Sequence, residues 1–307
     1  MSSKYDLIIV GGGVAGMTAA IYAARANLNT LLLEKMVCGG LVNSTYVVEN
    51  FPSYPGINGM DLMEKVREHV DSLGVTVTEV IDIQSLDLAG QTKTVSTDEG
   101  IFSAPAVILT TGRTPRKLAV ECDFEQIHYC AICDGSAYKD KDVIVVGGGN
   151  SGVDESLYLL GLGVRSILLV EEFDRLLASE KACGQLKSHA NVEVMTSTRI
   201  VAISGNGRLE DVTLCNKNDD SQIKRRTDGM FIYIGQDPQT ALFKDLIEMD
   251  TAGYVQVDTE MKTSLPGVFA AGDVTRKKYR QITTAMGDAT IAALTAVEYL
   301  SAIRREK

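Results

Sequence analysis

Two glycine-rich stretches, Gly11-Gly12-Gly13-Val14-Ala15-Gly16 and Gly147-Gly148-Gly149-Asn150-Ser151-Gly152, decide the fold of this chain. Each stretch follows a short apolar segment that is typical of a buried strand, and each precedes an amphipathic helical pattern and a second apolar strand. The second strand ends at Glu34 in one unit and at Glu171 in the other, 23 and 24 residues after the first glycine of the turn. A strand, a glycine turn, a helix, a strand and a terminal acid in that order indicate a dinucleotide-binding fold, and this sequence contains the pattern twice.

The pattern predicts an α/β protein with two Rossmann-like domains. The expected elements are strands at residues 7–10, 30–33, 106–109, 143–146, 166–170 and 267–271, and helices at about 15–26 and from the second turn to Leu160. The last of these strands runs into Gly272-Asp273, which is similar to the flavoprotein pattern in which an aspartate at a strand end binds the ribityl chain. This motif lies far along the chain from the first turn. We therefore expect a flavin domain, residues 1–115 and 239–307, split by an inserted nicotinamide-binding domain, residues 116–238, with linkers near Pro115 and Asp237-Pro238.

Composition narrows the class of protein. The 307 residues are enough for two domains, and the net charge of −10 argues against nucleic-acid binding, which needs a basic surface. No apolar run approaches the length of a membrane span, and no secretory signal is visible before the first strand. We expect a cytoplasmic protein without membrane or nucleic-acid partners.

The sequence Cys130-Ala131-Ile132-Cys133-Asp134 lies between the two glycine turns. In a reducing compartment a Cys-x-x-Cys pair is more often catalytic than structural, and at a helix start the nearby N–H groups stabilise a thiolate. Asp134 can give a proton to a leaving thiolate and take it back. No metal site is expected, because the chain has three histidines, none at ligand spacing, and no second Cys-x-x-Cys. The remaining cysteines are predicted to be small buried residues: Cys38, Cys122, Cys183 and Cys215.

Together these motifs resemble the low-molecular-weight thioredoxin reductases over nearly the whole chain. The resemblance is carried by Val48-Glu49-Asn50-Phe51-Pro52, Thr110-Thr111-Gly112, the Cys-x-x-Cys-Asp-Gly box, both glycine turns, Gly272-Asp273-Val274 and Tyr279-Arg280-Gln281. It implies a homodimeric FAD enzyme that reduces the disulfide of thioredoxin or a thioredoxin-like protein. It further implies that Cys133 faces the flavin and forms a transient adduct with it, that Cys130 attacks the partner's disulfide, and that Asp134 is the general acid.

The turns and the resemblance together predict two sets of binding residues. The residues expected to bind FAD are Gly11, Gly13, Ala15, Gly16, Glu34, Lys35, Gly40, Leu41, Asn50, Thr111, Gly112, Gly272, Asp273, Arg280, Gln281 and Ile282. Those expected to bind a nicotinamide nucleotide are Gly147, Gly149, Asn150, Ser151, Gly152 and Glu171. In each set the glycines admit the pyrophosphate and the acid can bind the adenosine ribose.

Two departures from the family pattern bear on the cofactors. Gly40 stands where the family usually has a glutamine beside the flavin. After the second strand of the nicotinamide domain, Glu171-Glu172-Phe173 stands in place of the His-Arg-Arg stretch that holds the 2′-phosphate of NADPH. Carboxylates facing a phosphate cost several kcal/mol, so we expect NADPH to be a poor donor and NADH to be favoured.

Other functions stay open from the sequence. The second nucleotide site could be vestigial, with electrons supplied by ferredoxin or another carrier. The chain could also be an NADH oxidase or a flavoprotein that serves a peroxiredoxin, although that function usually needs an extra N-terminal dithiol domain. A flavin redox sensor is disfavoured by the acid that follows the dithiol.

Overall fold

The computed structural model describes residues 3–45, 48, 50–121, 124–129 and 131–305. The chain divides into two compact units, one made of Met1–Thr114 and Asp237–Lys307 and the other of Pro115–Gln236. The second unit is thus an insertion in the first, and its ends lie within two residues of the predicted linkers. Which nucleotide each unit binds stays a prediction.

The first unit is built on a five-stranded parallel sheet with the order β19-β8-β2-β3-β4. Its strands are β2 (Leu7–Val10), β3 (Thr30–Leu33), β4 (Thr76–Thr78), β8 (Ala106–Leu109) and β19 (Val268–Ala270). β2, β3 and β8 have the bounds predicted from the sequence, whereas β19 is one residue shorter at each end. Every residue of β2, β3 and β8 is buried, as expected for a parallel sheet that is covered on both faces.

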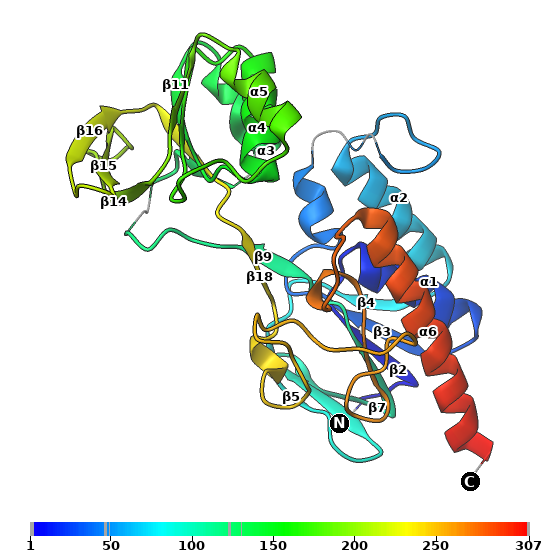
Figure 1. The fold of residues 1–307 in the computed structure, drawn as a ribbon. Helices are drawn as coiled ribbons and strands as arrows, with labels where there is room; N and C mark the ends of the chain where they lie inside the picture. The colour runs from blue at the N-terminus through cyan, green and yellow to red at the C-terminus, as the bar shows by residue number, and fades with distance from the viewer. Residues whose placement is uncertain (1–2, 46–47, 49, 122–123, 130, 306–307) are drawn as a thin grey trace. The chain divides into compact units, whose positions relative to one another are not determined.

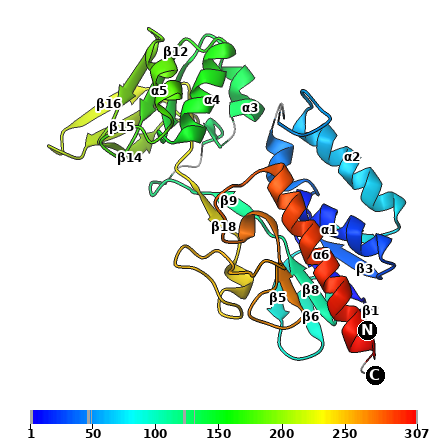
Figure 2. The ribbon, with the colours of Figure 1, turned by 45° about the vertical axis from the view of Figure 1, so that its right-hand side comes forward.

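Helices cover one face of this sheet and a small antiparallel meander packs on the other (Figures 1 and 2). The helices are α1 (Val14–Arg25), α2 (Gly59–Ser72) and α6 (Ile282–Arg305). The meander contains β5 (Ile83–Asp87), β6 (Lys93–Thr97) and β7 (Gly100–Ala104), with β1 (Ser3–Lys4) paired to β7. Alanines form much of the buried surface that α1 and α6 contribute to the core, so the two helix backbones can approach closely.

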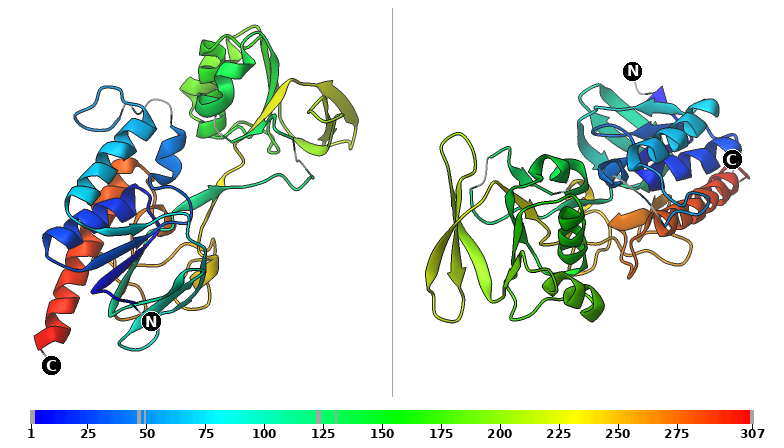
Figure 3. Two further views of the ribbon diagram at one scale, coloured as in Figure 1. Left: turned by 180° about the vertical axis from the view of Figure 1, so that it is seen from behind. Right: turned by 90° about the horizontal axis from the view of Figure 1, so that it is seen from above.

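The second unit repeats the plan. Its parallel sheet has the order β10-β17-β11-β12-β13, from β10 (Ile127–His128), β11 (Asp142–Val146), β12 (Ser166–Val170), β13 (Val192–Met195) and β17 (Gly229–Ile232). On one face lie α3 (Ala131–Asp134), α4 (Asn150–Gly161) and α5 (Glu180–Lys187). On the other lies the antiparallel sheet β14 (Thr198–Ser204), β15 (Asp211–Asn216) and β16 (Gln222–Arg226), visible in both views of Figure 3.

Short elements complete the chain. β9 (Arg113–Pro115) pairs with β18 (Gln236–Pro238), and the four 3-10 helices are η1 (Gly40–Ser44), η2 (Gly135–Tyr138), η3 (Ala241–Phe243) and η4 (Gly272–Val274) within the described ranges. No helix in the described part of the chain is long and apolar enough to cross a membrane. In both units the glycine turn follows the central strand at the carboxyl edge of a parallel sheet, where such folds bind ligands.

Candidate functional site

The first glycine turn leaves space where a phosphate would lie. Gly11 has a φ of +107°, and a Cβ there would lie 2.5 Å from the Thr110 carbonyl oxygen. A Cβ on Gly16 would lie 1.8 Å from the Gly11 carbonyl oxygen, so both positions require glycine. A Cβ on Gly13, by contrast, meets nothing within 4 Å. Helix α1 begins at Val14 without a side-chain cap, so its first N–H groups face this open space and can bind an anion.

Glu34 lies at the carboxyl end of β3 and is fixed by two backbone groups. Its Oε2 accepts a hydrogen bond of 2.5 Å from the Gly12 N–H, and its Oε1 accepts one of 2.9 Å from the Met36 N–H. The carboxylate stays partly exposed, whereas the neighbouring Lys35 points to solvent. Each oxygen retains a lone pair, so the carboxylate can accept hydrogen bonds from ribose hydroxyls.

The segment 38–41 lies against the turn. The Gly39 N–H donates to the Gly12 carbonyl oxygen at 2.9 Å, and a Cβ on Gly40 would lie 3.2 Å from the Gly13 Cα, while Leu41 is exposed. Gly40, where the family has an amide side chain, thus brings its backbone close to the predicted phosphate site.

Cys38 departs from the prediction that the single cysteines are buried. It is only half-buried, and its N–H donates to the Glu79 Oε1 at 2.6 Å. Burial, helped by the Glu79 carboxylate, raises the pKa of the Cys38 thiol to about 12, so it stays protonated and unreactive at neutral pH. Cys183 is also half-buried, Cys215 is buried as predicted, and Cys122 lies outside the described residues.

The fold brings Gly272 and Asp273 to the start of α1. Gly272 has a φ of +78°, and a Cβ there would lie 2.8 Å from the Ala15 Cβ. Asp273 Oδ2 accepts hydrogen bonds of 3.1–3.2 Å from the Arg113 guanidinium. Its Oδ1 is buried without a hydrogen-bond partner in the described part of the chain, since the Lys277 Nζ is 3.8 Å away. An orphaned acceptor beside an open glycine turn fits a cofactor that carries hydroxyl groups, so these residues fit FAD.

Four more of the predicted FAD residues lie near the start of α6 in the chain or contact that region. Asn50 Nδ2 donates to Gln281 Oε1 at 2.9 Å, although 231 residues separate them, and Ile282 begins α6. Arg280 lies over the Tyr254 ring, 4.3 Å from its centroid, and has a buried Nε without a partner among the described residues.

Thr111 and Gly112 instead contact the returning chain at Gln239. The Thr111 Oγ1 donates to the Gln239 carbonyl oxygen at 2.6 Å, and the Gln239 N–H donates to the Gly112 carbonyl oxygen at 3.0 Å. The structure therefore places these two residues where the first unit's two chain segments meet.

The second turn has the same geometry as the first. Gly147 has a φ of +107° with a hypothetical Cβ 2.3 Å from the Tyr233 carbonyl oxygen, and a Cβ on Gly152 would lie 1.8 Å from the Gly147 carbonyl oxygen. A Cβ on Gly149 meets nothing within 4 Å, and α4 begins at Asn150 without a side-chain cap. The turn can therefore receive a second pyrophosphate.

Two predicted nucleotide ligands flank this second turn on α4. The Asn150 Oδ1 accepts a hydrogen bond of 3.1 Å from the Ser179 N–H, which ties the helix start to the segment before α5. Ser151 is exposed.

Glu171 makes the same kind of contacts at the second turn as Glu34 makes at the first, but its side chain is more buried. Its Oε2 accepts a hydrogen bond of 2.5 Å from the Gly148 N–H and its Oε1 one of 3.0 Å from the Phe173 N–H. Only 5% of Glu171 is exposed. The segment that follows also holds the turn, because the N–H groups of Leu177 and Ala178 both donate to the Gly148 carbonyl oxygen.

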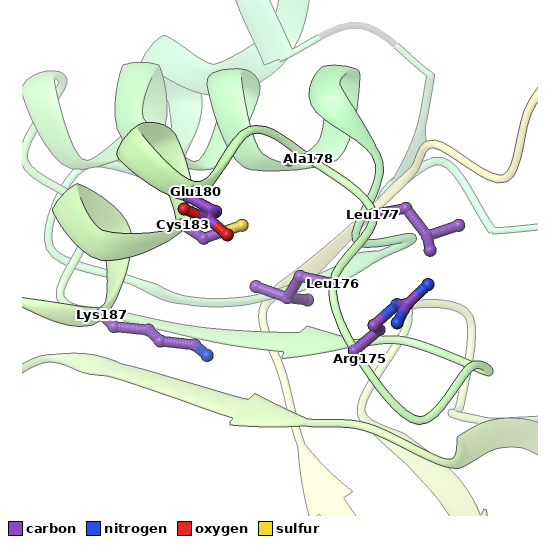
Figure 4. Close-up of a pocket in the computed structure, with 7 residues that line it drawn as sticks. All are labelled: Arg175, Leu176, Leu177, Ala178, Glu180, Cys183 and Lys187. Carbon is purple, nitrogen blue, oxygen red and sulfur yellow. The ribbon is translucent and has the colours of Figure 1, made fainter.

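A pocket of about 430 Å³ adjoins this segment (Figure 4). It is lined by Arg175, Leu176, Leu177, Ala178, Glu180, Cys183 and Lys187. Figure 4 shows Glu180, Cys183 and Lys187 projecting from helix α5 toward the segment. Leu176 links the pocket to the turn, since its Cδ2 would lie 2.4 Å from a Cβ on Gly148.

The dithiol box is described in part. Cys130 and the Cys133 side chain lie outside the described residues, and α3 is one turn long. The Ala131 N–H donates to the Tyr233 hydroxyl at 2.7 Å, and Asp134 Oδ2 lies 3.2 Å from His128 Nδ1. Asp134 is thus held by a residue that the sequence did not single out.

Glu155 on α4 was also missed by the sequence reasoning. Burial, with a smaller contribution from Asp154, raises the pKa of its carboxyl to about 7, and its Oε2 has no partner among the described residues. The neighbouring Tyr233 has a pKa raised mainly by burial and further by Glu155. The described part of the chain contains no cluster of three or more acidic, histidine or cysteine residues that could bind a metal ion.

Comparison with known proteins identifies the family. Residues 5–289 match the family described as pyridine nucleotide-disulphide oxidoreductase. The chain belongs to this family. It is 42% identical over 301 residues to a 34.2 kDa protein in the rubredoxin operon of Clostridium pasteurianum, with 97% of each chain covered. It is 36% identical over 310 residues to thioredoxin reductase of Bacillus subtilis strain 168, with 98% of this chain and 96% of the other covered.

Solved structures agree with this assignment. Thioredoxin reductase of Lactococcus lactis superposes with a TM-score of 0.87 at 35% identity, covering 97% of this chain and 99% of the other. That of T. acidophilum has a TM-score of 0.86 at 32% identity, covering 98% and 100%. The predicted fold with two Rossmann-like domains is confirmed, and the protein is an FAD-dependent oxidoreductase that acts on disulfides.

Proposed function

We propose that this protein reduces the disulfide of thioredoxin or a thioredoxin-like protein, with electrons passing through FAD and the Cys130–Cys133 dithiol. The observation that carries the proposal is the Cys130-Ala131-Ile132-Cys133-Asp134 box in a chain that aligns over 98% of its length with thioredoxin reductases. A cytoplasmic location and a homodimer belong to the same proposal.

The chain's own residues would hold FAD in the first unit. The open turn at Gly13 and the uncapped start of α1 would bind the pyrophosphate, and Glu34 would bind the adenosine ribose. Asp273 Oδ1 would accept a hydrogen bond from the ribityl chain. When bound, FAD supplies the two-electron chemistry that restores the dithiol.

The dithiol chemistry needs two exchange steps. The Cys130 thiolate attacks one sulfur of the partner's disulfide, so a mixed disulfide forms and the partner's other sulfur leaves as a thiolate. Cys133 then attacks the Cys130 sulfur, which closes the Cys130–Cys133 disulfide and releases the second partner thiolate. Asp134 can supply a proton to a departing thiolate and recover it from the next thiol.

We favour NADH as the electron donor. Glu171 makes the same pair of backbone hydrogen bonds at the second turn that Glu34 makes at the first, which suits an acid that binds a free ribose hydroxyl. No arginine follows directly at positions 172 and 173, and Glu172 is exposed with Lys217 Nζ 3.0 Å away. A 2′-phosphate would therefore meet carboxylates, which disfavours NADPH.

A donor other than a nicotinamide, such as ferredoxin, is the second candidate. It is favoured by the burial of Glu171, because a carboxylate that is only 5% exposed is less open to a ribose than the partly exposed Glu34. In that case the second unit would carry the dithiol and its nucleotide site would be vestigial.

An anaerobic titration separates these donors. The FAD-loaded protein would be mixed in parallel with NADH, NADPH and reduced ferredoxin while flavin absorbance is followed. We expect fast bleaching by NADH and slow bleaching by NADPH. Bleaching by ferredoxin alone would overturn the NADH proposal and leave the reductase proposal standing.

A cysteine variant tests the reductase itself. We expect Cys130→Ser to abolish reduction of oxidised thioredoxin while its flavin is still reduced by the donor. Cys183→Ser, in the same unit but outside the box, is the matched control and should keep full activity. Thioredoxin reduction that survives in Cys130→Ser would contradict the proposed function.

A further inference from the structure

Three side chains of the second unit form a hydrogen-bonded line that ends at Asp134. His128, at the end of β10, has its Nδ1 3.2 Å from Asp134 Oδ2 and its Nε2 2.6 Å from the Tyr138 hydroxyl. Asp134 ends α3, and Tyr138 ends the 3-10 helix that follows. The end of strand β10, the end of α3 and the 3-10 helix after it therefore meet at the imidazole ring.

Packing holds the imidazole ring and leaves the acid accessible. The His128 ring packs against Tyr138 and Phe231, with ring centroids 5.3 and 5.1 Å away, and those two rings also contact each other. Gly229 makes room for Tyr138, since a Cβ there would lie 2.1 Å from the tyrosine ring. The His128 side chain is 14% exposed and that of Asp134 41%. The buried end is thus rigid, and the carboxyl lies at the open end.

The hydrogen bonds fix which ring nitrogen carries the proton. Burial, with smaller contributions from Asp134 and Asp228, raises the pKa of the Tyr138 hydroxyl to about 12, so the phenol keeps its proton. The Asp134 carboxylate can only accept, so His128 Nδ1 donates to it and His128 Nε2 accepts from the Tyr138 hydroxyl. Burial also lowers the pKa of His128 and outweighs the opposing effect of Asp134, so the ring is neutral near pH 7. A neutral ring that accepts at Nε2 carries its hydrogen on Nδ1 and donates it to the Asp134 carboxylate.

Apart from Asp134, the charged groups around this line that the structure describes lie at its tyrosine end. Asp228 and Arg208 act on Tyr138, with Arg208 Nη2 3.7 Å from Asp228 Oδ1. The Lys141 Nζ lies over the Tyr138 ring, 5.1 Å from its centroid. Within the described part of the chain, Asp134 is the one charged group that affects the His128 ring itself.

We propose that His128 is a positioning residue for the proton-transfer step of disulfide reduction: its Nδ1–H holds Oδ2 of Asp134 and so presents Oδ1 to the thiol that exchanges the proton. The inference rests on the proposed function, in which Asp134 is the acid. Asp134 ends a single helical turn and is partly exposed, so without His128 its side chain would sample several rotamers. Proton transfer needs donor and acceptor within about 2.6–3.2 Å, and rotamer sampling would reduce the time spent there.

Substitutions at His128 separate positioning from packing. In His128→Asn the amide nitrogen takes the place of Nδ1 and can still donate to Asp134, whereas His128→Leu fills the site without a donor. Tyr138→Phe keeps the ring packing and removes the donor to Nε2. Each FAD-loaded variant would be reduced with dithionite, freed of excess reductant and mixed anaerobically with oxidised bacterial thioredoxin in a single turnover.

We expect His128→Leu to lower the saturated rate roughly 10–100-fold, a part of the usual contribution of a general acid, with the half-saturating thioredoxin concentration unchanged. Because Asp134 acts as an acid, the alkaline limb of the pH–rate profile of His128→Leu should move to higher pH, since the ionised carboxylate loses a hydrogen-bond donor. His128→Asn should stay within about threefold of the parent, and Tyr138→Phe should lie between the two. Equal losses in the Asn and Leu variants, or an unmoved pH profile in the Leu variant, would overturn the positioning role.

A second readout does not depend on thioredoxin. Iodoacetamide alkylates the Cys130 thiolate in the reduced protein, and mass spectrometry of its peptide measures the extent. The pH dependence of this reaction reports proton exchange between the dithiol and Asp134. The pH at which alkylation is half-maximal should shift in His128→Leu and should be unchanged in His128→Asn. If the parent protein fails to reduce thioredoxin, the proposed function fails, and the alkylation profiles still decide whether His128 acts on the dithiol; unchanged profiles would refute it.

Discussion

The two glycine turns share their backbone geometry and differ in what covers them. In both turns the third glycine is open and a terminal glutamate accepts the N–H of the second. Glu34 is partly exposed, and a segment with two glycines, Gly39 and Gly40, follows it. Glu171 is 5% exposed, and Leu176 packs on its turn instead.

This difference between the turns suggests two distinct functions within each site. One is to bind the pyrophosphate that all dinucleotides share, and the other is to select which nucleotide binds. The glycines and the helix start set the shape that receives a pyrophosphate, and this shape is common to both units. The segment after the second strand differs in size and charge, so it decides how open the acid is and what the ribose meets. Four predictions, ordered from the largest expected effect to the smallest, test these differences between the two units.

Replacing the open glycine in each turn should remove one ligand and spare the other. Gly13 and Gly149 have ordinary extended conformations, with φ of −66° and −75°, so a valine fits the backbone and fills the open space. We expect Gly13→Val to weaken FAD binding by at least about a thousandfold, because the side chain occupies the phosphate position. Gly149→Val should retain FAD and lose NADH-driven bleaching by about 100-fold or more.

Each variant controls for the other. FAD content would be measured by absorbance after gel filtration, and folding by circular dichroism. A Gly149→Val protein that NADH still bleaches at the parent rate would show that the second turn binds no donor. A folded Gly13→Val protein that retains stoichiometric FAD would contradict the assignment of the first turn.

Neutralising the two acids should have smaller, parallel effects. A hydrogen bond to a charged group contributes about 1.5–3 kcal/mol, so Glu34→Gln should raise the Kd for FAD about 10–100-fold. Glu171→Gln should raise the KM for NADH by a similar factor with FAD binding unchanged. Fluorescence titration of FAD and initial rates with NADH measure the two constants, and an unchanged KM in Glu171→Gln would favour the vestigial second site.

Glu155 marks a further difference between the units, because Ala19 occupies the same position after the first turn. Its pKa of about 7 in the folded protein lies above its ordinary value of 4.5. The folded state therefore retains a proton that the unfolded state releases, so stability falls as the pH rises from about 4.5 to 7 and is constant above.

Glu155→Gln removes this penalty. We expect the variant to be more stable than the parent by about 1–2 kcal/mol at pH 8, after allowing for partial solvent screening, and nearly equal at pH 4.5. The melting temperature at both pH values measures the gain, and Asp154→Asn, which removes only the smaller contribution to the raised pKa, should give a smaller gain in the same direction. A stability gain that is the same at both pH values would rule out titration of Glu155 as its cause.

The smallest effect is expected from the charge at position 172. Glu172 is exposed, so Glu172→Arg leaves Glu171 and its hydrogen bonds to the turn in place. It should raise kcat/KM for NADPH about 3–10-fold by removing a repulsive carboxylate and adding a guanidinium, and it should leave NADH almost unchanged. Steady-state rates with both nucleotides at low salt are the measurement; parallel changes for the two would contradict a role for the 2′-phosphate.

The sequence by itself determined the two repeated units. The strand, glycine turn, helix and terminal acid are adjacent in the chain. The spacing of apolar residues and the positions of the glycines depend on local backbone conformation, so they can be recognised without knowledge of the tertiary structure. Strands β2, β3, β8 and β12 accordingly have their predicted bounds, and α1 begins within one residue of its predicted start. Gly272-Asp273 was also recognised, but only as a pattern.

Only the tertiary structure decided which distant residues meet and which polar groups are buried. The contacts of Gly272 with Ala15 and of Gln281 with Asn50 join residues more than 200 positions apart, and local sequence carries no record of such pairing. The raised pKa of Glu155 and the hydrogen bond from His128 to Asp134 depend on what packs around each side chain. Burial and hydrogen-bond geometry arise from the whole fold, so they could be seen only once the chain was folded.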